Sequence, residues 1–195
     1  MFFKVGGLLV LAVFYFCYFL KMFLQKKKGI KTDQMGKNKS GFPYYIEVIL
    51  KIVTIVNPLV EVISIYLNTK VFNDNVRLIG LLISVIGLVF FILSITTMKD
   101  SWRAGVSTDE KTDLVTSGIY QISRNPAFVG FDLVYIGMVM MFTNLWLYIV
   151  SMISIIMFHL QIVNVEEPFL MEVFGNEYIE YCKKVNRYLG RKKRN

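Results

Sequence analysis

The sequence predicts an all-α protein held in a membrane by about five transmembrane helices. Of its 195 residues, 55% are hydrophobic and 18% are charged, and the mean hydropathy is +0.52. A soluble domain of this size carries about a quarter charged residues. Long apolar stretches recur along the chain, and the basic residues gather between them. These observations exclude a disordered chain, a coiled coil and a nucleic-acid-binding arm.

Three apolar stretches in the N-terminal part, residues 1–97, are long enough to span a membrane. A bilayer core of about 30 Å needs about 20 mostly apolar residues in a helix. The stretches are Phe2–Leu24, Tyr44–Leu67 and Leu78–Thr97. In the second, Glu47 and Lys51 are four residues apart and are expected to pair on one helix face. Asn57-Pro58 is expected to kink or locally open the same helix.

The first stretch is interpreted as an uncleaved anchor with its N-terminus outside. It lacks an Ala-x-Ala-like cleavage site, and its apolar part is long for a signal peptide. Lys26, Lys27 and Lys28 follow it immediately, and such a basic cluster is retained in the cytoplasm.

A fourth apolar stretch, Ala127–Val165, is too long for one span. Thr143-Asn144 near its middle is a plausible turn, so the stretch predicts a helical hairpin with arms 127–142 and 145–165. Beyond it, apolar residues in Phe169–Arg187 recur at helical spacing with an interruption at Gly175. This pattern predicts one or two amphipathic helices on the inner membrane face.

The distribution of positive charge predicts the orientation. Five spans with an external N-terminus place the segments Lys21–Pro43, Met98–Pro126 and Glu166–Asn195 inside. These segments hold 18 of the 22 Lys and Arg residues, as the positive-inside rule requires. The excess of positive charge, +8 in net, is therefore interpreted as lying on a cytoplasmic surface that contacts membrane lipids. The basic run 191–194 is expected to contact lipids in the same way, and binding of nucleic acid is not expected.

The segment before the hairpin holds the first candidate site. Asn125 can cap a helix that Pro126 opens, and Arg124–Phe128 is interpreted as a strand or loop that leads into the hairpin. A helix start presents free backbone N–H groups that suit a carboxylate or phosphate. The alternative is an ordinary juxtamembrane cap with an anchoring arginine.

Ionisable residues near the end of the hairpin form the second candidate site. His159 and Glu166 are seven residues apart, hence on nearly the same helix face, and Asp132 lies inside the other arm. Ionisable side chains at membrane depth are functional suspects. His159 could equally be a buried histidine that bonds a neighbouring helix, and Glu166 and Glu167 could simply pair with Arg124 or the basic tail.

Metal and disulfide chemistry are not expected. His159 is the single histidine, and no cysteine or histidine cluster has the spacing of metal ligands. Cys17 and Cys182 lie far apart, one in an apolar run and one near the basic tail, and are interpreted as unpaired thiols.

An ordered set of short motifs resembles the isoprenylcysteine carboxyl methyltransferase family, and phospholipid N-methyltransferases share much of it. The pieces are Leu-Val-Thr-Ser-Gly-Ile-Tyr (114–120), Arg-Asn-Pro-Ala-Phe-Val-Gly (124–130), Glu-Glu-x-x-Leu (166–170), Phe-Gly-Asn-Glu-Tyr-Ile-Glu-Tyr (174–181) and Val-Asn-Arg (185–187). The resemblance covers about residues 98–190. It implies that 98–195 is a cofactor-binding region within a single membrane domain, 1–195.

The resemblance implies methyl transfer from S-adenosylmethionine to a lipophilic acceptor at the cytoplasmic membrane face. The Lys-, Asn- and Ile-rich composition and the short loops favour a bacterial cell membrane. The implied cofactor-binding residues are Leu114, Val115, Tyr120, Asn125, Pro126, Ala127, Phe128, Glu166 and Glu167. Arg124, Asp132, His159 and Ile162 are weaker candidates for contact with the acceptor, which would be a carboxylate, an amine or a hydroxyl.

The sequence departs from the family pattern at three places. Asn125 replaces a usual histidine, so a titrating base at this position is excluded. Phe128 replaces a usual tyrosine. An arginine that often precedes the Glu-Glu pair is missing, with Gln161 and Ile162 in its region, which argues against a prenylcysteine carboxylate as the acceptor. The alternative functions are a membrane NADPH-dependent sterol or enone reductase and a catalytically silent protein of the same fold.

Overall fold

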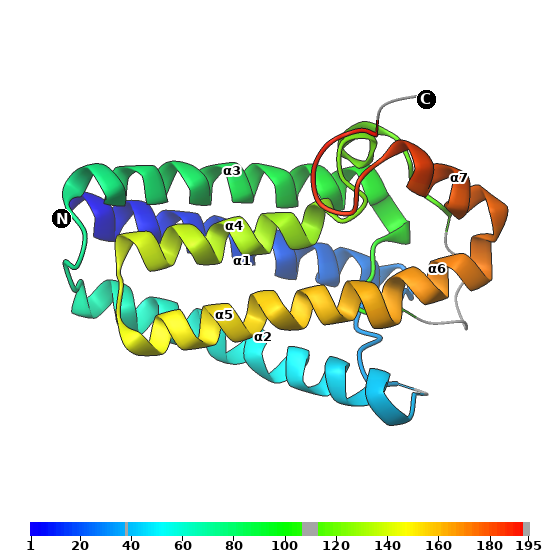
Figure 1. Cartoon of the computed structure of the whole chain (residues 1–195). Helices are drawn as coiled ribbons and strands as arrows, with labels where there is room; N and C mark the ends of the chain where they lie inside the picture. The colour runs from blue at the N-terminus through cyan, green and yellow to red at the C-terminus, as the bar shows by residue number, and fades with distance from the viewer. Residues whose placement is uncertain (38, 107–112, 193–195) are drawn as a thin grey trace.

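A computed structural model describes residues 1–37, 39–106 and 113–192 (Figure 1), and over these residues the chain is helical, with two isolated β-bridges and no strand. The long helices are α1 (Phe2–Lys27), α2 (Gly41–Leu67), α3 (Asp74–Met98), α4 (Pro126–Met141) and α5 (Leu145–Gln161). The shorter elements are the 3-10 turns η1 (Lys99–Ser101) and η2 (Gly118–Gln121), a π-helical turn η3 (Ile162–Glu166), α6 (Glu167–Phe174) and α7 (Asn176–Lys184).

The predicted all-α membrane architecture is confirmed. Among the described residues, four helical runs are long and apolar enough to cross a membrane, namely α1, α2, α3 with η1, and α5 continued through η3 and α6. The fifth expected span is α4, an apolar helix of 16 residues that is shorter than the others. The helical hairpin is confirmed, because α4 and α5 are joined at Phe142–Asn144, where Asn144 caps α5 by accepting from Leu147 N at 3.0 Å.

Glycines let α3 and α4 approach closely along their length. A Cβ added at Gly87 would lie 2.7 Å from the carbonyl oxygen of Gly130, and one at Gly137 would lie 2.3 Å from that of Gly80. Backbones in membrane proteins approach in this way where small residues face each other. The pair α3–α4 therefore forms the rigid side of the bundle, against which α1 also packs.

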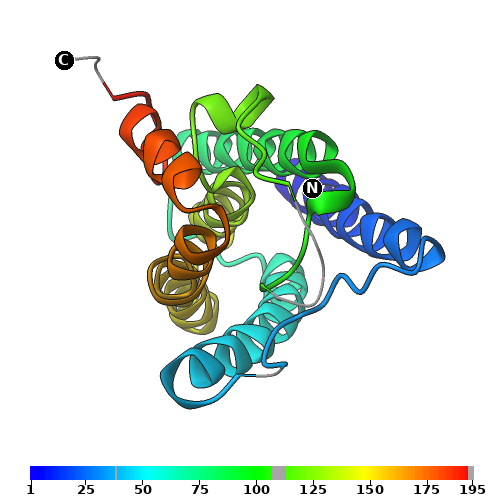
Figure 2. The same cartoon turned by 90° about the vertical axis from the view of Figure 1, so that its right-hand side faces the viewer.

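Polar side chains join α2 to α5 at three levels. Gln161 Nε2 donates to Glu47 Oε1 at 3.1 Å, Asn57 Nδ2 donates to Ser154 Oγ at 3.1 Å, and Asn144 Nδ2 donates to Ser64 Oγ at 2.6 Å. Helix α2 contains Pro58 in its interior and stays helical on both sides of it, so the expected local opening does not occur. Helices α1 and α2 meet only over a short stretch and lie apart in the view of Figure 2.

The segment that joins α1 to α2 folds back over the end of the bundle. Gln34 N donates to Ala104 O at 2.8 Å, and Ala104 N donates to Thr32 O at 2.9 Å, so the segment is bonded to the chain after α3. This bridge, made by residues 32–34 with Ala104, is called the roof bridge below.

The prediction that Glu47 and Lys51 form an ion pair with each other is wrong. Lys51 Nζ pairs with Asp33 Oδ2 at 2.6 Å, and Glu47 Oε1 pairs with Lys39 Nζ at 2.5 Å. The backbone N–H of Gly36 also donates to Glu47. The folded-back segment supplies these partners, which a pattern within one helix does not reveal.

Two short helices, α6 and α7, follow η3. Gly175, with φ of 51°, breaks the helix between α6 and α7 and turns the chain across the end of the bundle (Figure 1). A small core of Tyr120, Tyr178, Tyr181 and Val185 holds α7 against η2. Lys193 and Arg194 of the predicted lipid-contacting tail lie outside the described residues.

Candidate active site

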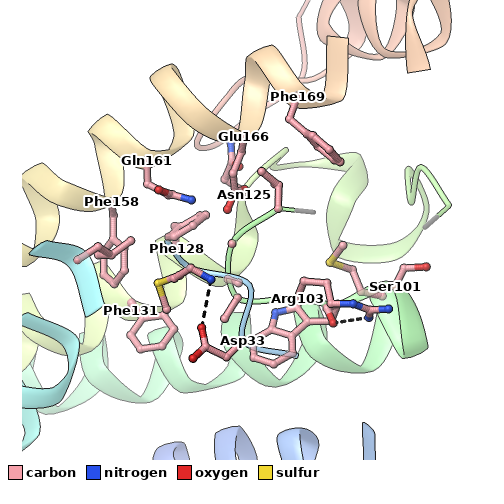
Figure 3. A pocket seen from close by; sticks show the side chains of 18 of the residues that line it. Asp33, Ser101, Arg103, Asn125, Phe128, Phe131, Phe158, Gln161, Glu166 and Phe169 are labelled. Atoms are coloured by element: carbon pink, nitrogen blue, oxygen red, sulfur yellow. Dashed lines mark hydrogen bonds between the residues drawn. The ribbon is translucent and has the colours of Figure 1, made fainter. Parts of the chain in front are cut away.

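A cavity of about 470 Å³ lies at the end of the bundle where η2, the start of α4, η3 and the roof bridge meet. Ligand pockets commonly enclose about 300–1,000 Å³. Its lining includes the predicted site residues Leu114, Val115, Tyr120, Arg124, Asn125, Ala127, Phe128 and Glu166. The structure thus brings eight residues from three separate motifs around one cavity (Figure 3).

One polar end of the cavity is formed by Glu166, Gln161 and Asn125, and the lining elsewhere includes Asp33 and Arg103. Asn125 Nδ2 donates to the carbonyl oxygen of Arg187 at 3.0 Å. The side-chain oxygen of Asn125 therefore remains available as an acceptor for a ligand. The side-chain oxygen of Gln161 is buried and has no hydrogen-bond partner among the described residues. This end therefore presents acceptor oxygens, which suit a ligand that carries N–H, O–H or ammonium groups.

The π-helical turn η3 determines which residues face the cavity. An i→i+5 turn adds about one residue to the helical repeat and rotates everything after it. The expected common face of His159 and Glu166 is therefore wrong. Glu166 lines the cavity, whereas His159 is exposed outside it and contacts the hydroxyl of Tyr188 at 2.5 Å.

Helix α4 begins at the cavity. Pro126 is its first residue, and Asn125 occupies the cap position without a side-chain cap bond. Of the expected strand or loop at Arg124–Phe128, Arg124 and Asn125 form a loop, and the helix already starts at Pro126. Ala127 and Phe128 line the cavity in the first turn, so the uncapped helix start faces it.

Glu167 lies behind the cavity wall rather than in it. Its carboxylate pairs with Arg124 Nη2 at 2.9 Å and with Arg187 at 2.8 Å through both Nε and Nη2. The hydrogen bonds to Glu167 raise the pKa of Arg187. Arg124 Nη1 also donates to Tyr178 OH at 3.0 Å. This network fixes the loop before α4 to α6 and α7. The alternative that the acidic residues pair with nearby arginines therefore holds for Glu167 and not for Glu166, which has no ion pair with a described residue.

Tyr120 joins the lining to the small core under α7. Its hydroxyl lies 2.7 Å from Ser94 Oγ, and its carbonyl oxygen accepts from Tyr181 OH at 2.6 Å. Burial raises the pKa of the hydroxyls of both tyrosines, so both stay protonated at physiological pH. Tyr120 is therefore a fixed neutral wall of the cavity.

Other predicted residues lie elsewhere. Pro126, Asp132 and Ile162 are not part of the cavity lining, and Asp132 has a buried carboxylate oxygen without a partner among the described residues. Several lining residues were not predicted, including Tyr18, Asp33, Trp102, Phe131, Phe158 and Gln161. Gln161 carried a usable signal, since an amide within an apolar helix needs a partner.

Two residues of the cavity lining are also exposed on the outside of the bundle. Phe19 of α1 is 61% exposed and Ile55 of α2 is 60% exposed, yet both line the cavity. Both helices are long and apolar enough to cross a membrane, so the lining extends to faces that such helices present to the bilayer.

A model of the family described as phospholipid methyltransferase matches residues 76–177. The chain belongs to this family. The match begins in α3 and ends in α7, so it includes Asn125, Gln161 and Glu166 but neither α1 nor α2.

Three curated relatives of this member of the phospholipid methyltransferase family are named as protein-S-isoprenylcysteine O-methyltransferases. Protein-S-isoprenylcysteine O-methyltransferase of Saccharomyces cerevisiae is 30% identical over 130 residues, which are 66% of this chain and 53% of the relative. The protein of the same name from Tribolium castaneum is 26% identical over 187 residues, 92% of this chain and 63% of the relative. Protein-S-isoprenylcysteine O-methyltransferase B of Arabidopsis thaliana is 32% identical over 41% of both chains. The chain spans about half of the length of the relatives that it matches.

Proposed function

We propose that this membrane protein transfers a methyl group from S-adenosylmethionine to a lipophilic acceptor in the cavity at the end of the bundle. The observation that carries the proposal is the arrangement of Glu166, Gln161 and Asn125 beside the uncapped start of α4, in a cavity whose lining extends to exposed faces of α1 and α2. Family membership and the names of the relatives support the same chemistry. None of these names is that of a reductase, the first alternative.

The chemistry of the lining suits S-adenosylmethionine. Its ammonium and ribose hydroxyl groups are donors, which match the oxygens of Glu166, Gln161 and Asn125 through charge-assisted and neutral hydrogen bonds. The unpartnered oxygen of Gln161 is a buried acceptor that such a donor would satisfy. The carboxylate of the cofactor suits the N–H groups of Ala127 and Phe128 in the first turn of α4.

Aromatic residues complete the proposed cofactor site. Phe128 and Tyr120 provide ring faces for the adenine or the sulfonium. When bound, S-adenosylmethionine supplies a methyl group that its sulfonium makes electrophilic. The protein then has to align the acceptor with this methyl group and exclude water, and alignment alone is worth about 7–11 kcal/mol.

The apolar part of the cavity is the proposed acceptor site. Phe131 and Phe158 pack with ring centroids 5.2 Å apart, and the lining continues to Tyr15 and Pro58 in the membrane helices. The acceptor's reactive group stays open between carboxylate, amine and hydroxyl. Asn125 cannot act as a base, and Gln161 in the region of the family's arginine leaves an acidic acceptor without that cation.

The proposed orientation places the cavity at the cytoplasmic face. The segments that form it are the ones that carry most of the basic residues, and the external side then holds the chain between α2 and α3. This orientation gives the site access to cytoplasmic S-adenosylmethionine.

Titration calorimetry on the detergent-purified protein tests the proposal. We expect S-adenosylmethionine to bind and NADPH not to bind, and Glu166→Gln to abolish binding of the cofactor while the protein stays folded. Glu172→Gln is the matched control, because Glu172 is an exposed residue of α6 that does not line the cavity. Absence of S-adenosylmethionine binding by the wild-type protein would refute the function.

Transfer of a labelled methyl group into a total lipid extract identifies the acceptor. We expect a labelled lipophilic product with the wild-type protein and none with Glu166→Gln. Base-labile label indicates a carboxyl methyl ester, and base-stable label indicates an amine or a hydroxyl ether. Cofactor binding without any labelled product would instead support the catalytically silent alternative.

A further inference from the structure

A second cluster of buried polar groups lies in the middle of the bundle, beyond the floor of the cavity. Asn57 and Glu61 stand one turn apart on the inner face of α2, and both side chains are completely buried. Neither residue lines the cavity, and neither has a role in the proposed methyl transfer. An ionisable group at this depth of a membrane protein is costly and calls for a partner.

Four helices supply the surroundings of Glu61. Tyr15 of α1 lines the cavity floor and donates to Glu61 Oε2 at 3.5 Å, and fully buried Tyr135 of α4 lies within electrostatic reach of the same carboxyl. Ser154 of α5 accepts from Asn57, and Ser151 lies one turn earlier on α5. Since α2 and α5 run antiparallel, Ser151 is opposite the turn between Asn57 and Glu61.

Four buried oxygens of this cluster have no hydrogen-bond partner among the described residues. They are Glu61 Oε1, Asn57 Oδ1, Ser151 Oγ and the hydroxyl oxygen of Tyr135. Glu61 also forms no ion pair with any described lysine, arginine or histidine. By contrast, the equally buried Glu47 is bonded to Lys39, Gly36 and Gln161.

We propose that Glu61, Asn57 and Ser151, with the hydroxyl of Tyr135, form a binding site for a monovalent alkali cation such as Na⁺. Hard cations take oxygen ligands from carboxylates, amides and hydroxyls, which are the groups gathered here. One carboxylate balances one positive charge, so a monovalent ion leaves the site neutral in the membrane interior. The bound ion would join α2 to α5 and α4.

Thermal unfolding of the detergent-purified full chain in different chloride salts tests the site. At equal ionic strength we expect NaCl or KCl to raise the unfolding midpoint over choline chloride by about 2–4 °C or more at saturation. Glu61→Gln, which keeps the size of the side chain and removes its charge, should abolish the difference. Glu47→Gln is the matched control and should retain it, because its carboxylate already has three donors.

Ser151→Ala is the second variant, in case Glu61→Gln does not fold. It removes one ligand and should increase the cation concentration that gives half of the shift by about tenfold. Equal midpoints of the wild-type protein in all three salts would overturn the proposal. So would a salt difference that survives in Glu61→Gln, or one that Ser151→Ala shows at the same half-saturating cation concentration as the wild-type protein, since either would be a general salt effect. Neither result depends on methyl transfer.

Discussion

Gln161 lies beside two carboxyl groups. Nε2 donates to Glu47 Oε1 at 3.1 Å, and Glu166, five residues further along the π-helical turn, lines the same end of the cavity. Gln161 is therefore a positioning residue that joins the turn carrying the candidate cofactor carboxylate to α2.

Gln161→Leu should weaken binding of S-adenosylmethionine about tenfold, because it removes an unpartnered acceptor oxygen of the cavity and the hydrogen bond that joins this turn to Glu47. Calorimetry measures the change. Asn164→Leu is the matched control, since Asn164 lies in the same turn but donates only to the carbonyl oxygen of Leu160. Gln161→Glu should not rescue binding, because it adds a third carboxylate. Unchanged affinity of Gln161→Leu would remove the positioning role.

Tyr181→Phe should lower the free energy of unfolding by about 1 kcal/mol. The variant removes the hydroxyl that donates to Tyr120 O at 2.6 Å and leaves that buried carbonyl without its donor. Thermal unfolding in detergent measures the loss. Tyr45→Phe, at an exposed position of α2, is the control and should leave the midpoint unchanged. Equal midpoints of the two variants would contradict the expectation.

At the scale of elements, apolar length and turn chemistry predicted most of the fold. The hairpin over residues 126–161 follows from an apolar run too long for one span with Asn144 at its turn. The π-helical turn was not predicted, because it has no local sequence pattern. The pairing of Glu47 with Lys51 failed for a related reason, since partners distant in sequence reach both side chains.

The candidate site was predicted in part, through the resemblance of its motifs to a known family. That resemblance supplied Asn125, Ala127 and Phe128 at the start of α4 and Glu166 in η3, whereas helix periodicity alone put Glu166 on the same face as His159. The aromatic lining from α1 and α2 belongs to ordinary apolar spans, in which cavity-lining and lipid-facing residues look alike. Phe19 and Ile55 illustrate this, since each is both exposed and part of the lining.

Gly87→Ala should disrupt the contact of α3 with α4. The added Cβ would lie 2.7 Å from the carbonyl oxygen of Gly130, a backbone atom that moves only with its helix. Overpacking of this kind costs about 1–3 kcal/mol. Thermal unfolding measures the effect. Ile86→Ala, at a half-exposed neighbouring position of α3, is the control and should cost less. A Gly87→Ala variant as stable as the control would contradict close backbone packing here.

At the scale of the whole molecule, the proposed orientation predicts which positions a membrane-impermeant maleimide reaches in intact cells. In a Cys17→Ser/Cys182→Ser background, Lys70→Cys between α2 and α3 should be labelled from outside. Leu189→Cys after α7 should be labelled only after lysis. Both positions are exposed on the surface of the protein, so a difference in labelling reports the side of the membrane and not burial of the side chain. The reverse pattern would invert the orientation and place the cavity on the external side.

The roof bridge has a consequence for the order of assembly. Its two parts, residues 32–34 and Ala104, are separated in the sequence by α2 and α3. During synthesis residues 32–34 emerge long before Ala104, so their backbone groups stay unpaired until two further helices are inserted. Contacts between distant residues also form late because closing the intervening loop costs entropy. The wall of the cavity made by the roof bridge is therefore expected to close last, after the membrane helices have packed.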